Sequence, residues 1–110
     1  MPNITSNYIV VFCTVPDEYV AEKIANKVVQ KKLAACCNII PGLRSIYIWK
    51  NEIQDDKEML LIIKTKKDIF TKLQKAITEI HPYSIPEIIS ISIENGSKNY
   101  LNWVEQNVKQ

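Results

Sequence analysis

Two neighbouring segments decide the fold of this chain: Arg44-Ser45-Ile46-Tyr47-Ile48-Trp49-Lys50 and Met59-Leu60-Leu61-Ile62-Ile63. In the first, isoleucine side chains alternate with serine and aromatic ones, as the two-residue period of a β-strand requires. The second is apolar on both faces, as a buried strand is. Polar and charged residues join the two segments. The sequence therefore predicts a long β-hairpin.

Helical patterns stand on both sides of this hairpin. Residues 17–32 and 68–80 carry apolar side chains three and four positions apart, which predicts two amphipathic helices. Thr14 precedes Asp17 by three residues, a spacing that resembles a capping box for the first helix. A short final helix is expected to begin after Ser97 as its N-cap.

Extended patterns occupy the rest of the chain. Residues 8–13 and 33–40 predict strands, the second of them closed by the turn-forming pair Pro41-Gly42, and residues 89–93 alternate isoleucine with serine. The resulting order predicts an α+β domain with the ferredoxin-like split β-α-β arrangement, an extended hairpin and a C-terminal helix. We expect one domain over residues 8–110 and a flexible N-terminal extension over residues 1–7.

This architecture leaves one face of the sheet without helices. The strands at 8–13 and 59–63 are nevertheless apolar on both faces, and Tyr47 and Trp49 project from a hairpin too long for the core of the domain. A monomer would expose a large apolar patch, so we expect a homo-oligomer in which Tyr47 and Trp49 contact a neighbour. The alternative is a final helix that folds back over this face. Packing is also the expected role of Trp103.

Composition excludes several classes of protein. The 110 residues carry a net charge of +2 and no basic stripe, which argues against nucleic acid as a partner. No apolar stretch is long enough to span a membrane, and the N-terminus has no targeting pattern, so a cytoplasmic protein is expected. The three cysteines have neither disulfide nor zinc spacing, which predicts reduced thiols and, as the ordinary role, small core side chains.

The sole histidine stands in His81-Pro82-Tyr83-Ser84-Ile85-Pro86-Glu87. Each proline restricts its own φ and holds the preceding residue in extended geometry, so this segment displays an imidazole, a phenol and a carboxylate on a rigid loop. The segment is either a loop that only separates a helix from a strand or one wall of a functional cleft.

Several short motifs occur in a specific order from residue 9 to residue 103. They are Cys13-Thr14-Val15-Pro16, Lys32-Leu33-Ala34-Ala35-Cys36, Ile40-Pro41-Gly42, Ser45-Ile46-Tyr47-Ile48-Trp49, His81-Pro82-Tyr83 with Pro86-Glu87, and Tyr100-Leu101-Asn102-Trp103. In these motifs the chain resembles the CutA family of divalent-ion tolerance proteins. The resemblance implies a ferredoxin-like homotrimer associated with copper and other divalent ions.

The resemblance also implies metal ligands. Cys13, Cys36 and His81 match the positions of the family's proposed copper ligands, whereas Ile80 stands where some bacterial members have a second histidine. A set with two thiols suits Cu(I) better than Cu(II). Because Cys36 and Cys37 are adjacent, they point to opposite faces of a strand, and at most one of them can reach any single site.

A second hypothesis is a trimeric signalling or scaffold module that binds a small anionic ligand or a protein partner in clefts between subunits. Lys64, His81, Tyr83 and Glu87 would line this cleft. Three of them also have an ordinary role: Lys64 as a solvated lysine, Tyr83 as an interface residue, and Glu87 as a carboxylate bonded to nearby backbone. Catalysis is not expected, because the chain has no signature for a group that orients a Cys–His pair or for an oxyanion hole.

Overall fold

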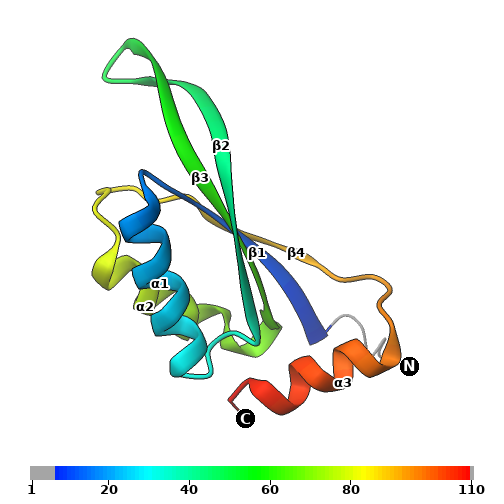
Figure 1. Ribbon diagram of the computed structural model, residues 1–110. Helices are drawn as coiled ribbons and strands as arrows, with labels where there is room; N and C mark the ends of the chain where they lie inside the picture. The colour runs from blue at the N-terminus through cyan, green and yellow to red at the C-terminus, as the bar shows by residue number, and fades with distance from the viewer. Residues whose placement is uncertain (1–6, 110) are drawn as a thin grey trace.

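The computed structural model describes residues 7–109, which form an α+β domain (Figure 1). The expected extension at residues 1–7 lies outside the described part except for Asn7. In chain order the elements are β1 (Tyr8–Val15), α1 (Glu18–Gln30), β2 (Cys36–Trp49), β3 (Glu52–Lys66), the 3-10 turn η2 (Lys67–Ile69), α2 (Phe70–Ile80), β4 (Ile88–Ser92) and α3 (Lys98–Asn107).

The four strands form a single antiparallel sheet in the order β2-β3-β1-β4. Helices α1 and α2 lie together against one face, and α3 lies at the end of the sheet where β1 begins (Figure 1). We call the face opposite α1 and α2 the open face. The predicted antiparallel sheet with helices on one side is therefore confirmed.

The core lies between the sheet and the two long helices. Alternate residues of β1 point toward the helices, and Val11, Cys13 and Val15 are completely buried. The antiparallel partners of Val11 and Cys13 on β3, Ile63 and Leu61, are equally buried. From α1 and α2, the fully buried side chains are Ala21, Ile24, Val28, Leu73 and Ile77. The apolar faces predicted for both helices therefore face the core.

The helix ends show one difference from the sequence-based expectation. Asp17, rather than Thr14, caps α1, since its Oδ1 accepts a hydrogen bond from the Val20 N–H at 2.9 Å. Thr14 is still in β1, where the extended backbone keeps its side chain away from the helix. The expected cap at Ser97 is confirmed, with its hydroxyl accepting from the Tyr100 N–H.

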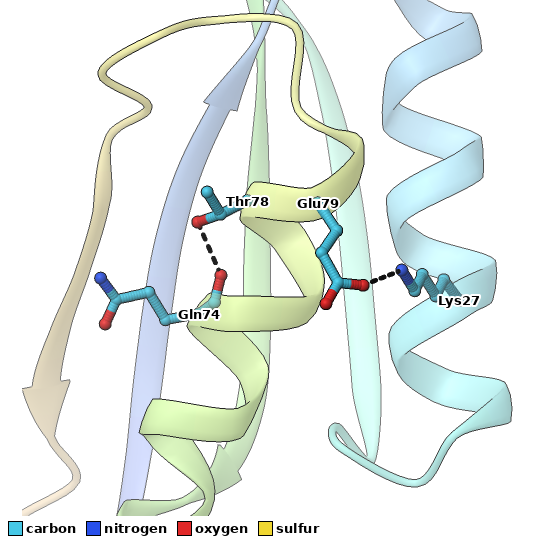
Figure 2. A network of polar contacts seen from close by, with 4 residues as sticks. All are labelled: Lys27, Gln74, Thr78 and Glu79. Atoms are coloured by element: carbon cyan, nitrogen blue, oxygen red, sulfur yellow. Dashed lines mark hydrogen bonds and ion pairs between the residues drawn. The ribbon is translucent and has the colours of Figure 1, made fainter.

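Polar contacts also join the two helices. Lys27 Nζ on α1 lies 3.2 Å from Glu79 Oε2 on α2, and the Thr78 hydroxyl donates to the Gln74 carbonyl within α2 (Figure 2). Both interactions lie on the exposed side of the helix pair, so the buried aliphatic residues account for most of the packing.

The Pro41-Gly42 pair does not end a strand, as the sequence had suggested. Instead β2 runs through it from Cys36 to Trp49, with a register shift between Ile40 and Leu43. Gly42 has φ +84°, a left-handed conformation that glycine adopts without steric cost. The pair is therefore a bulge inside one long strand, and such bulges increase local bending and twist.

The hairpin formed by β2 and β3 projects beyond the helices (Figure 1). Ile46, Ile48 and Ile53 on it are between 66% and 77% exposed, and Tyr47 and Trp49 are about two-fifths exposed. At the turn, Lys50 and Asn51 both have positive φ, as a tight two-residue hairpin turn requires. The projecting hairpin predicted from the sequence is present.

The open face keeps apolar side chains that this chain does not cover. Ile89 and Ile91 on β4 pair with Phe12 and Val10 on the open face of β1, and both isoleucines are more than half exposed. Helix α3 contacts one end of the sheet, where Glu105 Oε2 lies 2.7 Å from Lys66 Nζ and Glu105 Oε1 accepts from the Tyr8 hydroxyl. The alternative in which the final helix covers this face therefore holds only at that end.

Within residues 7–109 no helix is both long and apolar enough to cross a membrane.

Candidate functional site

His81 is a buried residue at the end of α2. It is 7% exposed, and its ψ of 132° takes the chain out of the helix before Pro82. Its Nε2 lies 2.8 Å from the Thr14 carbonyl oxygen, and its Nδ1 lies 3.1 Å from the Tyr83 backbone nitrogen. Because a carbonyl accepts and an amide N–H donates, these two contacts match the tautomer that carries its proton on Nε2. Both ring nitrogens are engaged within the chain.

Cys13 lies beside the same carbonyl group. Its side chain is completely buried, and its Sγ is 3.8 Å from the Thr14 oxygen. Burial raises the pKa of the Cys13 thiol to about 12, and the negative charges of Cys37, Glu87 and Glu58 contribute in the same direction. The structure thus brings the Cys13 thiol and the His81 imidazole to the same carbonyl oxygen.

Cys36 lies on the other side of the sheet. In the register it pairs with Lys64, which pairs in turn with Val10, whereas Cys37 pairs with Ile63 on the face that contacts the helices. A single chain in this conformation therefore does not bring Cys36 to Cys13 and His81. Over residues 7–109, no group of three or more His, Cys, Asp or Glu side chains is arranged to hold a metal ion.

Cys37 is partly buried and packs against the core. It shares the helix-facing side of the sheet with Cys13, and burial raises the pKa of its thiol to about 12, with Cys36 contributing further. The negative charge of either Cys13 or Cys37 would disfavour that of the other. The ordinary role of small core side chain, considered for each cysteine from the sequence, describes Cys13 and Cys37.

A groove lies between the projecting hairpin and the proline-bracketed loop at residues 82–87. Its volume is about 570 Å³, within the range of small-molecule sites. The lining side chains come from β1, the hairpin and the loop, and they are Thr14, Ser45, Ile46, Tyr47, Trp49, Glu58, Tyr83, Ser84, Ile85 and Glu87. Two of the residues expected in a cleft, Tyr83 and Glu87, line this groove.

Glu58 joins the loop to the hairpin. It is 7% exposed, and its Oε2 accepts a hydrogen bond of 2.8 Å from the Tyr83 hydroxyl. Burial and this bond raise the pKa of Tyr83. Nearby, the Tyr47 hydroxyl donates to Asp56, and that bond raises the pKa of Tyr47. The sequence interpretation missed Glu58, whose only signal was a charged residue just before an apolar strand run.

Lys64 and His81 do not line the groove. Lys64 contacts the Asn38 side chain beside Cys36, and it is six residues along β3 from Glu58, or roughly 20 Å at the rise of an extended strand. The His81 ring lies 4.8 Å from the Tyr83 ring, centroid to centroid, and is tilted by 54° against it. The His81 imidazole therefore supports Tyr83, which lines the groove. Lys64, the cationic side chain expected in the cleft, lies elsewhere on β3.

These features define a small α+β protein in which a projecting hairpin and a rigid loop frame a groove on an antiparallel sheet. The chain belongs to the family described as CutA1 divalent ion tolerance protein, whose profile matches residues 9–107. The resemblance inferred from the sequence motifs is confirmed.

Several relatives share this sequence and fold. The Divalent-cation tolerance protein CutA of Thermus thermophilus is 47% identical over 98 residues, covering 89% of this chain and 95% of that protein. Human Protein CutA is 45% identical over 86% of this chain, which spans only 53% of the human protein. The crystal structure of CutA1 from Oryza sativa superposes with a TM-score of 0.93 at 37% identity, covering 98% and 99% of the two chains.

Proposed function

We propose that the chain acts in divalent-cation tolerance as a homotrimeric binding protein, with its ligand site in the groove between the projecting hairpin and the loop at residues 82–87. The observation that carries this proposal is the groove itself, whose walls come from three separate parts of the chain and include the exposed side chains of Ile46 and Ile85. We assign the strand order β2-β3-β1-β4 to the ferredoxin-like split β-α-β arrangement.

Assembly is supported by the unsatisfied apolar surface. Isoleucines 46, 48, 53, 89 and 91 are all more than half exposed, and single chains seldom leave such a surface in water. In a trimer, the open faces would contact one another and the hairpins would bring Tyr47 and Trp49 onto neighbouring subunits. This assembly would bury the exposed isoleucines and place each groove next to a second subunit. Sedimentation at low micromolar concentration tests this, and a stable monomer would contradict it.

The ligand of the groove is proposed to be a small polar molecule or a segment of a partner protein. A thermal-shift screen in the presence of a chelator tests this proposal, because chelation removes free metal ions and leaves organic ligands. Stabilisation that survives chelation supports an organic ligand. Stabilisation that chelation abolishes would favour metal binding.

Copper binding through Cys13, Cys36 and His81 is the second candidate. Its support is the convergence of Cys13 and His81 on the Thr14 carbonyl. The arrangement of a single chain does not fit a site of all three, since Cys36 faces the opposite side of the sheet and both His81 nitrogens are occupied. Reduced thiols of this kind would suit a cytoplasmic location.

Calorimetric titration with Cu(I) tests this second candidate. A site that uses all three residues predicts lower affinity in Cys13→Ser, Cys36→Ser and His81→Ala alike. If only Cys36→Ser lowers the affinity, the metal binds at the open face, and equal affinity in all three variants excludes the site.

A further inference from the structure

The groove between the hairpin and the loop combines aromatic rings with carboxylates. Tyr47, Trp49 and Tyr83 contribute the rings, and Glu58 and Glu87 contribute the carboxylates. Among the described residues, those that line the groove include no Lys, Arg or His. The walls are therefore negative, although the whole chain carries a net charge of +2.

Neighbouring ionisable groups respond to this negative charge. Burial and then Glu58 raise the pKa of Tyr83, and the bond to Asp56 raises the pKa of Tyr47, with a further contribution from Glu58. Cys13, behind the groove, has its pKa raised first by burial and then by charges that include Glu87 and Glu58. A positive charge placed in the groove would experience the opposite, favourable interaction.

We propose that the groove binds an organic cation, specifically an alkylammonium ligand. The faces of tryptophan and tyrosine rings attract ammonium groups, and carboxylates add charge-assisted hydrogen bonds. Ile46 and Ile85 also line the groove and offer apolar contact to an alkyl chain. This inference rests on the ligand-binding function proposed above and specifies the charge of the ligand. It replaces the anionic ligand, which depended on Lys64 and His81.

One buried element preorganises this wall. Glu58 is held by the Tyr83 hydroxyl, and Tyr83 is held by its ring contact with His81 and by the hydrogen bond from its backbone nitrogen to His81 Nδ1. Glu87, by contrast, is exposed at the rim. Glu87 is therefore the carboxylate that can be changed without disturbing the loop.

Trp49 provides a direct readout. The chain has two tryptophans, and Trp103→Phe leaves Trp49 as the only one. Putrescine, the four-carbon diamine, is titrated into this variant and followed by tryptophan fluorescence, with succinate as the dianion of equal length and NaCl to match ionic strength. We expect a saturable change with putrescine and none with succinate. Glu87→Gln should weaken putrescine binding about tenfold or more, and Glu22→Gln on the exposed side of α1 should leave it unchanged.

The outcomes separate the two proposals. Succinate binding without putrescine binding would overturn the preference for cations and leave ligand binding in the groove intact. Equal putrescine affinity in the parent and Glu87→Gln variants would also overturn the cation site. If neither compound changes the fluorescence and the thermal-shift screen is negative as well, both the cation site and the proposed ligand-binding function fail.

Discussion

His81 and Cys13 meet at one atom, the carbonyl oxygen of Thr14, to which His81 Nε2–H donates at 2.8 Å and from which Cys13 Sγ lies 3.8 Å. The contact ties the end of α2 to the end of β1, directly behind the groove. A residue that resembles a metal ligand in sequence thus has a structural role in the folded chain.

The contact between His81 and the Thr14 carbonyl should stabilise the fold. His81→Ala should lower the free energy of unfolding by about 2 kcal/mol, because it removes the partner of the Thr14 carbonyl and leaves space in a packed site. His81→Gln should lose less, since a glutamine amide can still donate toward Thr14. Chemical denaturation of the three proteins measures this. An alanine variant as stable as the parent would show that the hydrogen bond contributes nothing.

Alkaline pH should destabilise the fold through Cys13. Its pKa is about 12 in the folded chain against an ordinary 9.0, mainly because the thiol is buried. Between these values the unfolded chain loses the proton that the folded chain keeps, so the free energy of unfolding falls as pH rises. The full stabilisation is present below about pH 9, and the expected slope above it is roughly 1.4 kcal/mol per pH unit per thiol.

Substitution isolates this effect from the other groups that titrate at high pH. Cys13→Ala and Cys37→Ala should each flatten the decline of stability between pH 9 and 11, since the Cys37 thiol is shifted to the same degree. Urea denaturation at half-unit steps of pH provides the slopes. If the stability of the variants declines as steeply with pH as that of the parent, other groups cause the alkaline sensitivity.

Assembly should depend on Trp49. Trp49→Ala is expected to weaken association by more than about 2 kcal/mol, since a partly exposed tryptophan on a projecting hairpin is the kind of residue that anchors interfaces. Tyr19→Ala is the matched control, because Tyr19 on α1 is 71% exposed and lies away from the hairpin. Sedimentation velocity over a concentration series compares them, and oligomers that persist equally in both variants refute the assignment.

Two ion pairs should differ in their contribution to stability. Lys66 Nζ lies 2.7 Å from Glu105 with its side chain only 10% exposed, whereas Lys27 and Glu79 lie 3.2 Å apart at the surface. Glu79→Gln should change the free energy of unfolding by less than about 1 kcal/mol. Glu105→Gln should lower the free energy of unfolding by more than that. Thermal unfolding at low and high salt measures both. Equal effects would mean that burial does not strengthen the pair that holds α3.

Local patterns in the sequence predicted most of the fold. The helices, the hairpin and the cap at Ser97 depend on short-range periodicity and on local hydrogen bonding, which are visible within one or two turns of chain. The Pro41-Gly42 bulge was missed because a turn and a bulge use the same residues. Only pairing with β3 on both sides of the shift distinguishes them.

The sequence by itself determined the family, the order of the elements, and the presence of an apolar face that the chain does not cover. Tertiary structure alone decided which of the candidate site residues lie together. The register across β1, β3 and β2 separates Cys36 from Cys13, and the buried hydrogen bonds of His81 make it a support. Burial also brings Glu58 to Tyr83. These are contacts between strands and loops far apart in the chain, and residue spacing carries no information about which faces meet across a sheet.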